Sequence, residues 1–412
     1  MSELAEANAV ARVEGLTVRF NRHNGLLQMG LRLLTDQPPE ALHGEMRALR
    51  PLSNARVEIL PGAPGQLRVE GTAVLPPGMA PSELRLLLAA GKEPLLAVAT
   101  GEVIEDRADL VSLEPTGDGA VAQAWSDPGI ATQLWVDHRL EGMIKASPGL
   151  LRTRLPIRPN SIAVSADGRR GLPTNPLGGW LAAPEARDGR LDALRDRHAG
   201  ATAWLIGNGP SVRPEDLDAL RGQLCFGFNR LHLAYGGTSL RPRYTFSGDG
   251  QMIADFGEEI VAEAGGTVFL ATESRPAIPG EWIWLRQLSI WPPLFSLDPG
   301  RVVGAGGSSL FAAMQVAWWM GVRRFVFYGI DFSFHGVEPG LDGLATAEGN
   351  HFIPGYRSGR PWIPPSWRDI CSAFLLARRL AEAEGGWVRN ATRGGQLEIF
   401  PRIRFEDALR LG

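Results

Sequence analysis

The chain has 412 residues, of which 44% are hydrophobic and 21% charged; this composition leaves room for two folded domains and excludes a disordered or fibrous protein. Its 42 basic and 45 acidic side chains give a formal net charge of -3, so overall charge favours neither nucleic acid nor an anionic membrane as partner. No apolar stretch approaches the roughly 18 residues of a membrane span, and the first residues lack signal-peptide features, which predicts a cytoplasmic protein.

The positions of the lysines and cysteines exclude several kinds of catalytic site. The two lysines of the sequence are Lys92 and Lys145, so the C-terminal two-thirds has no lysine for a P-loop, a Schiff base or a lysine general base. Cys225 and Cys371 lie far apart and match no metal or redox spacing, so we expect two buried thiols.

The first 170 residues consist of short apolar runs separated about every ten residues by Gly, Pro, Asp or Asn. This rhythm predicts a β-rich domain over residues 1–170, a sandwich or partial barrel, with one helix over residues 38–48. His23, His43 and His138 share no ligand spacing, so no metal site is predicted there. Residues 171–200 are rich in Gly, Pro and charge, which predicts a linker.

From residue 201 the pattern changes to short apolar strands alternating with longer helical segments. ATAWLIG, CFGFN, RYTFSGD and RRFVFYGID are continuous apolar runs, as in the buried strands of a parallel sheet. Helices are expected over residues 308–321 and 366–384, and the second carries an apolar stripe that we interpret as core. The sequence therefore predicts an α/β fold with a Rossmann-like, mainly parallel sheet over residues 201–412.

Candidate binding residues follow the predicted strands. The first strand runs directly into Gly207, Asn208, Gly209, Pro210 and Ser211, and later strands end at Asn229, Asp249 and Asp331. Ligands of open α/β sheets bind beyond the carboxyl ends of the strands, where glycines allow close approach to a phosphate or ribose. A tight turn into a helix near Pro214 and simple helix capping by Asn229 or Asp249 are the structural alternatives.

A second glycine-rich segment precedes the helix over residues 308–321. Residues 304–307 read GAGG and are followed by Ser308 and Ser309. Backbone N–H groups and the helix dipole favour an anion at such a start, although ordinary capping by Ser308 explains the serine equally well.

A segment of more than 30 residues follows Asp331 and carries His335, His351, Tyr356, Arg357 and Arg360. A connection this long is typical of a functional lid. A neutral imidazole can accept a hydroxyl proton near pH 7, so His351 is the best candidate for a general base, with a structural histidine as the alternative. Tyr356, Arg357 and Arg360 could stabilise charge on a departing phosphate.

These motifs resemble a known group of proteins over residues 201–405. The residues that carry the likeness are GNGPS, a strand ending in Asn, GGSSLFAAMQVAWWMGVRRFVFYGIDFSF, NHFIPGY and NATRGGQLEIFPR. They resemble bacterial sialyltransferases of lipo-oligosaccharides, and also polysaccharide-cluster proteins related to 6-hydroxymethylpterin diphosphokinase.

The first resemblance implies inverting, metal-independent transfer of a sugar from a CMP-activated donor to a glycan acceptor, without a cofactor. It implies nucleotide contacts from Asn208, Gly209, Ser211, Asn229 and Ser309, with His351 as the base. The chain departs from that pattern at Gly306, Ser333 and Phe334, and Tyr356 is the other position at which the family's histidine could align.

Two other functions remain open. The second resemblance implies an ATP-dependent diphosphokinase in which Asp249 and Asp331 hold Mg²⁺. The third reading is a non-catalytic nucleotide- or glycan-binding protein, in which Trp125, Trp135 or Trp180 of the N-terminal part could stack on sugars. Acceptor binding and self-association as a homo-oligomer are open roles for the β-rich part.

Overall fold

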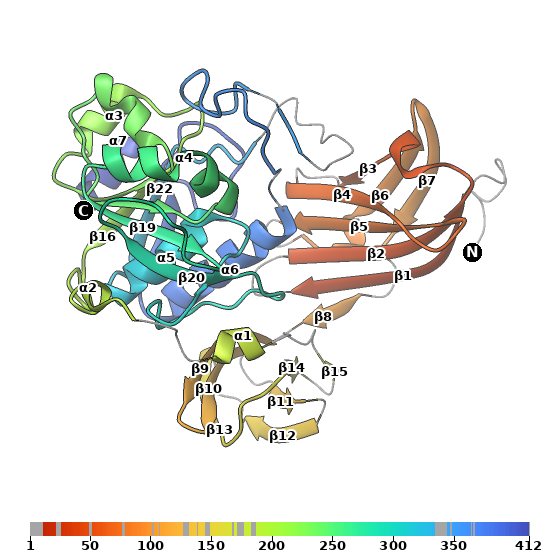
Figure 1. Ribbon diagram of the computed structural model, residues 1–412. Helices are drawn as coiled ribbons and strands as arrows, with labels where there is room; N and C mark the ends of the chain where they lie inside the picture. The colour runs from red at the N-terminus through yellow and green to blue at the C-terminus, as the bar shows by residue number, and fades with distance from the viewer. Residues whose placement is uncertain are drawn as a thin grey trace. The chain divides into compact units, whose positions relative to one another are not determined.

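The computed structural model (Figure 1) describes residues 11–21, 26–48, 52–75, 79–100, 103–106, 108–126, 132–137, 139–144, 149–166, 169–170, 177–182, 187–333, 344–346, 348–363, 365 and 367–411. The chain forms two compact units, Met1–Arg107 and Ala108–Gly412. The helices in the described ranges are all too short or too polar to cross a membrane.

The first unit consists of two sheets around one apolar core. Its five-stranded sheet has the order β4 (Ser53–Pro61), β5 (Gln66–Val74), β2 (Leu26–Thr35), β1 (Ala11–Asn21) and β8 (Ile104–Asp106). The three-stranded sheet has the order β3 (Leu42–Arg47), β6 (Arg85–Ala90) and β7 (Glu93–Ala99). Short 3₁₀ turns lie at Pro39–Ala41 and Pro81–Glu83. Alternate side chains such as Leu31, Val69 and Leu86 fill the core, which confirms the β-rich prediction.

The helix predicted over residues 38–48 is wrong. The 3₁₀ turn at Pro39–Ala41 leads directly into β3, which pairs antiparallel with β6 from Leu42 opposite Ala90 to Arg47 opposite Arg85. Leu42 and Met46 are buried while His43 and Arg47 between and after them are exposed, which is the two-residue alternation of a strand.

The second unit begins with two further antiparallel sheets. One has the order β13 (Gly149–Leu155), β10 (Gly119–Ser126) and β9 (Ala108–Thr116); the other has the order β12 (Arg139–Ile144), β11 (Thr132–Val136), β14 (Ile162–Ala166) and β15 (Arg169–Arg170). Short helices α1 (Gly178–Leu181) and α2 (Gly189–Asp192) follow. Leu113 and Trp180 share one core with Leu294 and Val302, so these strands pack with the α/β part rather than separately from it.

An eight-stranded parallel sheet forms the body of the second unit (Figure 1). Its order is β21 (Val303–Gly304), β20 (Ile283–Leu288), β19 (Thr267–Thr272), β18 (Tyr244–Ser247), β17 (Leu224–Phe228), β16 (Thr202–Ile206), β22 (Arg324–Tyr328) and β23 (Trp387–Asn390). All seven neighbouring pairs are parallel. The predicted Rossmann-like α/β fold is therefore confirmed.

Helices cover both faces of this sheet. They are α3 (Pro214–Ala219), α4 (Gly250–Glu263), α5 (Ser309–Trp319), α6 (Trp367–Ala383) and α7 (Phe405–Ala408), with 3₁₀ turns at Leu231–Gly236 and Leu409–Leu411. Tyr328 packs on Phe405 of α7, whereas its neighbour Phe327 packs on Phe374 of α6. Adjacent strand residues point to opposite faces, so β22 is buried on both sides.

The strand order reverses at β16. From β16 the chain proceeds through β17, β18, β19, β20 and β21 in one direction, and then returns to place β22 and β23 on the other side of β16. Loops that leave two strands in opposite directions open a crevice at their carboxyl ends, which is where ligands bind in such sheets. The segments after Ile206 and after Tyr328 meet at this switch point.

Candidate functional site

A cavity of about 510 Å³ opens at the carboxyl ends of the parallel strands. It is lined by residues that follow β16, β17, β18, β20 and β22, by the start of α5, and by residues between 350 and 370. Its volume is within the range of small-ligand sites. Of the predicted nucleotide residues, those in its lining are Gly207, Asn208, Gly209, Asn229, Asp249, Ser308, Ser309 and Asp331.

The segment after β16 lies against the segment after β22. Gly207 N–H donates to Tyr328 O at 2.8 Å, and Gly209 N–H donates to Gly329 O at 2.9 Å. A Cβ atom on Gly209 would collide with the Asp331 carboxylate, so only glycine allows this approach. Between them, Asn208 donates from Nδ2 to Phe228 O at 2.9 Å, and its Oδ1 is buried without a hydrogen-bond partner among the described residues.

Ser211 and Pro210 are outside the lining of the cavity. The Ser211 hydroxyl donates to Asp331 Oδ2 at 2.8 Å, and its N–H faces the same oxygen at 3.3 Å. Ser211 therefore holds Asp331, while Pro210 is exposed.

Asn229 and Asp249 each have a local structural partner. Asn229 has φ +49°, and its Oδ1 accepts from the Ser247 hydroxyl at 2.8 Å. Asp249 caps α4, because one carboxylate oxygen accepts from Gln251 N–H at 2.9 Å and Met252 N–H at 3.1 Å. The capping alternative for Asp249 is thus present in the structure, although the residue also borders the cavity.

The start of α5 brings a helix N-terminus to the cavity. Ser308 caps the helix by accepting from Leu310 N–H at 3.3 Å, and the Ser309 hydroxyl accepts from Gly248 N–H at 3.0 Å. Gly306 and Gly307 have φ +53° and +70°, in the left-handed region that favours glycine. The dipole of α5 has its positive end at this helix N-terminus, so the potential there favours an anionic ligand.

The structure adds side chains that the sequence did not single out. Gln287 of β20 donates from Nε2 to Gly248 O at 2.7 Å, and its Oε1 is buried without a partner among the described residues. Trp291, Trp362 and Ile363 give the cavity an apolar side. Only the alternation of β20 could have suggested Gln287, because its role depends on a neighbour 39 positions away.

His351 lies at the cavity with its ring stacked on Tyr356. The ring centroids are 3.9 Å apart and the planes differ by 12°. Burial, with a smaller contribution from the nearby Arg357 charge, lowers the pKa of His351 to about 4, so the imidazole is neutral at pH 7. Tyr356 is 1% exposed, and burial raises the pKa of its hydroxyl.

Arg357 and Arg360 both bind the carboxylate of Asp255 on α4. Arg357 donates to Oδ2 at 2.7 Å and Arg360 donates to Oδ1 at 2.9 Å. The Arg357 side chain is buried and borders the cavity, whereas the Arg360 side chain is 52% exposed and is absent from the lining. These pairs fasten the segment around residue 357 to α4.

The remaining candidates lie elsewhere or outside the described residues. His23, His138 and His335 are outside them. Trp180 is buried and donates to Leu113 O at 2.7 Å, while the Trp125 ring lies 3.4 Å from the Arg379 guanidinium. Cys225 and Cys371 are buried free thiols, as predicted. Within the described ranges, no group of three His, Cys, Asp or Glu residues has metal-site geometry.

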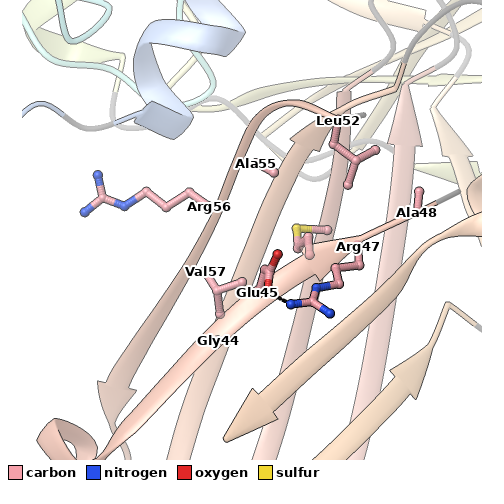
Figure 2. Close-up of a pocket in the computed structure, with 9 residues that line it drawn as sticks. Gly44, Glu45, Arg47, Ala48, Leu52, Ala55, Arg56 and Val57 are labelled. Atoms are coloured by element: carbon pink, nitrogen blue, oxygen red, sulfur yellow. Dashed lines mark ion pairs between the residues drawn. The ribbon is translucent and has the colours of Figure 1, made fainter. Parts of the chain in front are cut away.

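A second hollow of about 440 Å³ lies in the first unit along β3 and β4, as Figure 2 shows. Glu45 and Arg47 form an ion pair there at 2.8 Å, and both side chains are more than half exposed. Exposed pairs contribute little to stability, and the described residues that line this hollow include no nucleophile or base other than the pair itself. The cavity of the second unit is therefore the stronger candidate site.

Comparison with known proteins adds no family. No family model and no curated protein matches the chain. A solved titin structure, described as "Anomalous substructure of Titin-A168169", is similar at 8% identity over 39% of this chain and 93% of that chain, with a TM-score of 0.15. This likeness is too weak to indicate a fold or a function for the chain.

Proposed function

We propose that the second unit is a glycosyltransferase that moves a sugar from a nucleotide-activated donor, CMP-linked by the resemblance of its motifs to sialyltransferases, to a glycan acceptor. The observation that supports this proposal is the shared cavity at the switch point, which Asn208, Asn229, Ser309 and His351 all border. These residues are distant in sequence and come from four different parts of the fold.

The polar side of the cavity suits a nucleotide. Backbone N–H groups at the start of α5 favour a phosphate, and the close-packed glycine segments let a ligand approach the backbone of β16 and β22. Amide side chains such as Asn208 and Asn229 offer both donors and acceptors for a base or a ribose.

His351 is the proposed base. In the proposed reaction an acceptor hydroxyl oxygen bonds to the anomeric carbon of the donor sugar, and the bond from that carbon to the phosphate oxygen breaks. The electron pair leaves with the nucleoside monophosphate, and the hydroxyl proton passes to His351. A neutral imidazole can take this proton, and an anionic donor beside it would raise its low pKa.

The test is release of the nucleotide from CMP-, UDP- and GDP-activated sugars, with water as acceptor because the glycan is unidentified. We expect selective CMP release, and a loss of about 100-fold or more in His351→Ala. His198→Gln is the matched control, since His198 bonds Tyr244 outside the cavity lining. No release from any nucleotide sugar, or an unchanged rate in His351→Ala, would contradict the proposal.

A further inference from the structure

Arg230 is a buried charged residue that the proposed chemistry does not use. It follows Asn229 directly at the end of β17, and its side chain is 7% exposed. Burying a guanidinium is costly unless most of its N–H groups are bonded, so its partners reveal what it holds in place.

One set of partners anchors Arg230 to α4. Its Nε and one terminal nitrogen donate to the two Glu259 oxygens at 2.8 and 3.0 Å, and the guanidinium lies 4.0 Å from the Phe256 ring centroid. Glu259 also bonds His232 Nε2 at 2.6 Å. Burial alone would raise the pKa of Glu259, but the hydrogen bonds from Arg230 and His232 outweigh it and lower that pKa.

The other set of partners lies in residues 356–358: Tyr356 supplies two of them, and Ser358 Oγ accepts from a terminal nitrogen at 3.4 Å. The backbone N–H of Arg230 donates to the Tyr356 hydroxyl at 3.2 Å, and the other terminal nitrogen donates to the Tyr356 carbonyl. Arg230 therefore holds this one residue at both its phenol oxygen and its backbone. These two contacts fix the position and the long axis of the Tyr356 side chain, which carries the ring on which His351 stacks.

We infer that Arg230 is a positioning residue: by holding Tyr356 in place, it fixes the position of the stacked His351 ring at the cavity. That this positioning of His351 assists catalysis rests on the function proposed above. A base works only when its nitrogen is within hydrogen-bond reach of the reacting hydroxyl, and small displacements of such groups reduce rates strongly. Asp255, one helical turn before Glu259, fastens Arg357 and Arg360 independently.

The direct test observes His351 itself, by NMR of the imidazole signals, in the full chain without substrate. The sequence has seven histidines, and loss of one signal in His351→Gln assigns it. In the wild type the ring current of the stacked Tyr356 should shift the His351 signal upfield. Tyr356→Leu should abolish that shift, and Arg230→Lys should reduce it while raising the pKa of His351 by at least one unit towards its ordinary 6.5.

Arg360→Lys is the matched control, because Arg360 binds the same segment to α4 through Asp255 and makes no hydrogen bond to Tyr356. It should leave the His351 signal and its titration unchanged. If Arg230→Lys does not fold, Glu259→Gln provides the same test by loosening Arg230 from α4. A wild-type shift and a wild-type titration in the folded variant would overturn the inference.

An activity measurement separates this inference from the proposed function. Arg230→Lys should lower kcat for donor cleavage at least tenfold while the KM for the donor changes less than threefold. A role confined to folding would instead lower both the active fraction and nucleotide binding. If His351→Ala cleaves the donor normally, the proposed base is wrong, whereas the NMR result still decides whether Arg230 positions the ring.

Discussion

At the scale of single residues, the site depends on two glycines whose lack of a side chain allows close approach. A Cβ atom on Gly207 would lie 2.5 Å from Gly329 O, and one on Gly209 would displace the Asp331 carboxylate. These contacts exist because β16 and β22 are neighbours at the switch point, although about 120 residues separate Ser211 from Asp331. The glycine pattern alone identifies a tight turn, and the parallel pairing explains why a turn there needs glycine.

Glu114 is a half-buried residue whose carboxyl titration should affect stability. It lies in β9 and accepts from Leu297 N–H at 2.8 Å. Burial, opposed by that hydrogen bond and by Arg301, raises its pKa from 4.5 to about 7. Because the folded state then binds the proton more tightly than the unfolded state, this residue lowers the free energy of unfolding as pH rises from about 4.5 to 7.

Glu114→Gln should remove this pH dependence while keeping an acceptor for Leu297. Between pH 5 and pH 8 the wild type should lose up to about 3 kcal/mol of its free energy of unfolding through Glu114. Glu114→Gln should not show this loss. Urea denaturation at both pH values measures it, with Glu273→Gln, an exposed glutamate of the same unit, as control. Equal pH dependence in Glu114→Gln and the wild type would show that Glu114 titrates normally.

Among the helices, α4 allows the capping role of Asp249 to be distinguished from a role in ligand or Mg²⁺ binding. The carboxylate accepts from two N–H groups in the first turn of α4, so Asp249→Ala should cost about 1 kcal/mol in free energy of unfolding. Asn is an equally good cap, so Asp249→Asn should keep the wild-type stability.

The same pair of variants tests the magnesium alternative. If Asp249 only caps the helix and borders the cavity, Asp249→Asn should also keep CMP binding within about threefold, measured by calorimetry. An ATP- and Mg²⁺-dependent activity that Asp249→Asn abolishes would instead favour the diphosphokinase function, since an amide is a poorer Mg²⁺ ligand than a carboxylate.

The sequence correctly predicts the strands and helices that have a clear hydrophobic pattern. It fails where the pattern fits a helix and a strand equally well. The runs ATAWLIG, CFGFN, RYTFSGD and RRFVFYGID correspond to β16, β17, β18 and β22, and the two long helices correspond to α5 and α6. The sequence of residues 38–48 wrongly predicts a helix because Leu42 and Met46, four positions apart, fit a helical period as well as a strand.

The residues that line the candidate site are easier to predict from the sequence than the residues that hold them in place. Strand-end residues such as Asn208 and Asn229 are visible as polar residues after apolar runs. Arg230 and Gln287 acquire their roles only through partners such as Tyr356, 126 positions from Arg230, and Gly248. No local pattern encodes such contacts, because they arise from the packing of α4 and the segment around residue 356 on the sheet.

At the scale of the whole molecule, the compact units divide the chain at Arg107 rather than near residue 170. Strands β9, β10, β11, β13 and β14 share a core with Leu294 and Val302, and Phe295 N–H donates to Val111 O at 3.0 Å. A fragment of residues 108–412 should therefore unfold cooperatively and keep nucleotide binding. A fragment of residues 191–412 should be strongly destabilised, because removing these strands exposes apolar core.

Thermal unfolding of both fragments, followed by circular dichroism, measures this difference. A stable fragment of residues 191–412 with a melting temperature equal to that of residues 108–412 would show that the shared core contributes little to stability.

Nucleotide binding in the cavity at the switch point can be measured by the melting temperature of the full chain. CMP, UDP, GDP, ADP and ATP are each added with Mg²⁺ and with EDTA. A ligand at about 100 times its Kd adds roughly 2.7 kcal/mol to the free energy of unfolding, enough to raise the melting temperature measurably. If the cavity binds the nucleotide of a CMP-activated sugar, CMP should stabilise the chain in EDTA as well as in Mg²⁺, and Asn208→Ala should lose this stabilisation. Stabilisation by ATP alone and only with Mg²⁺, or no response to any nucleotide, would contradict it.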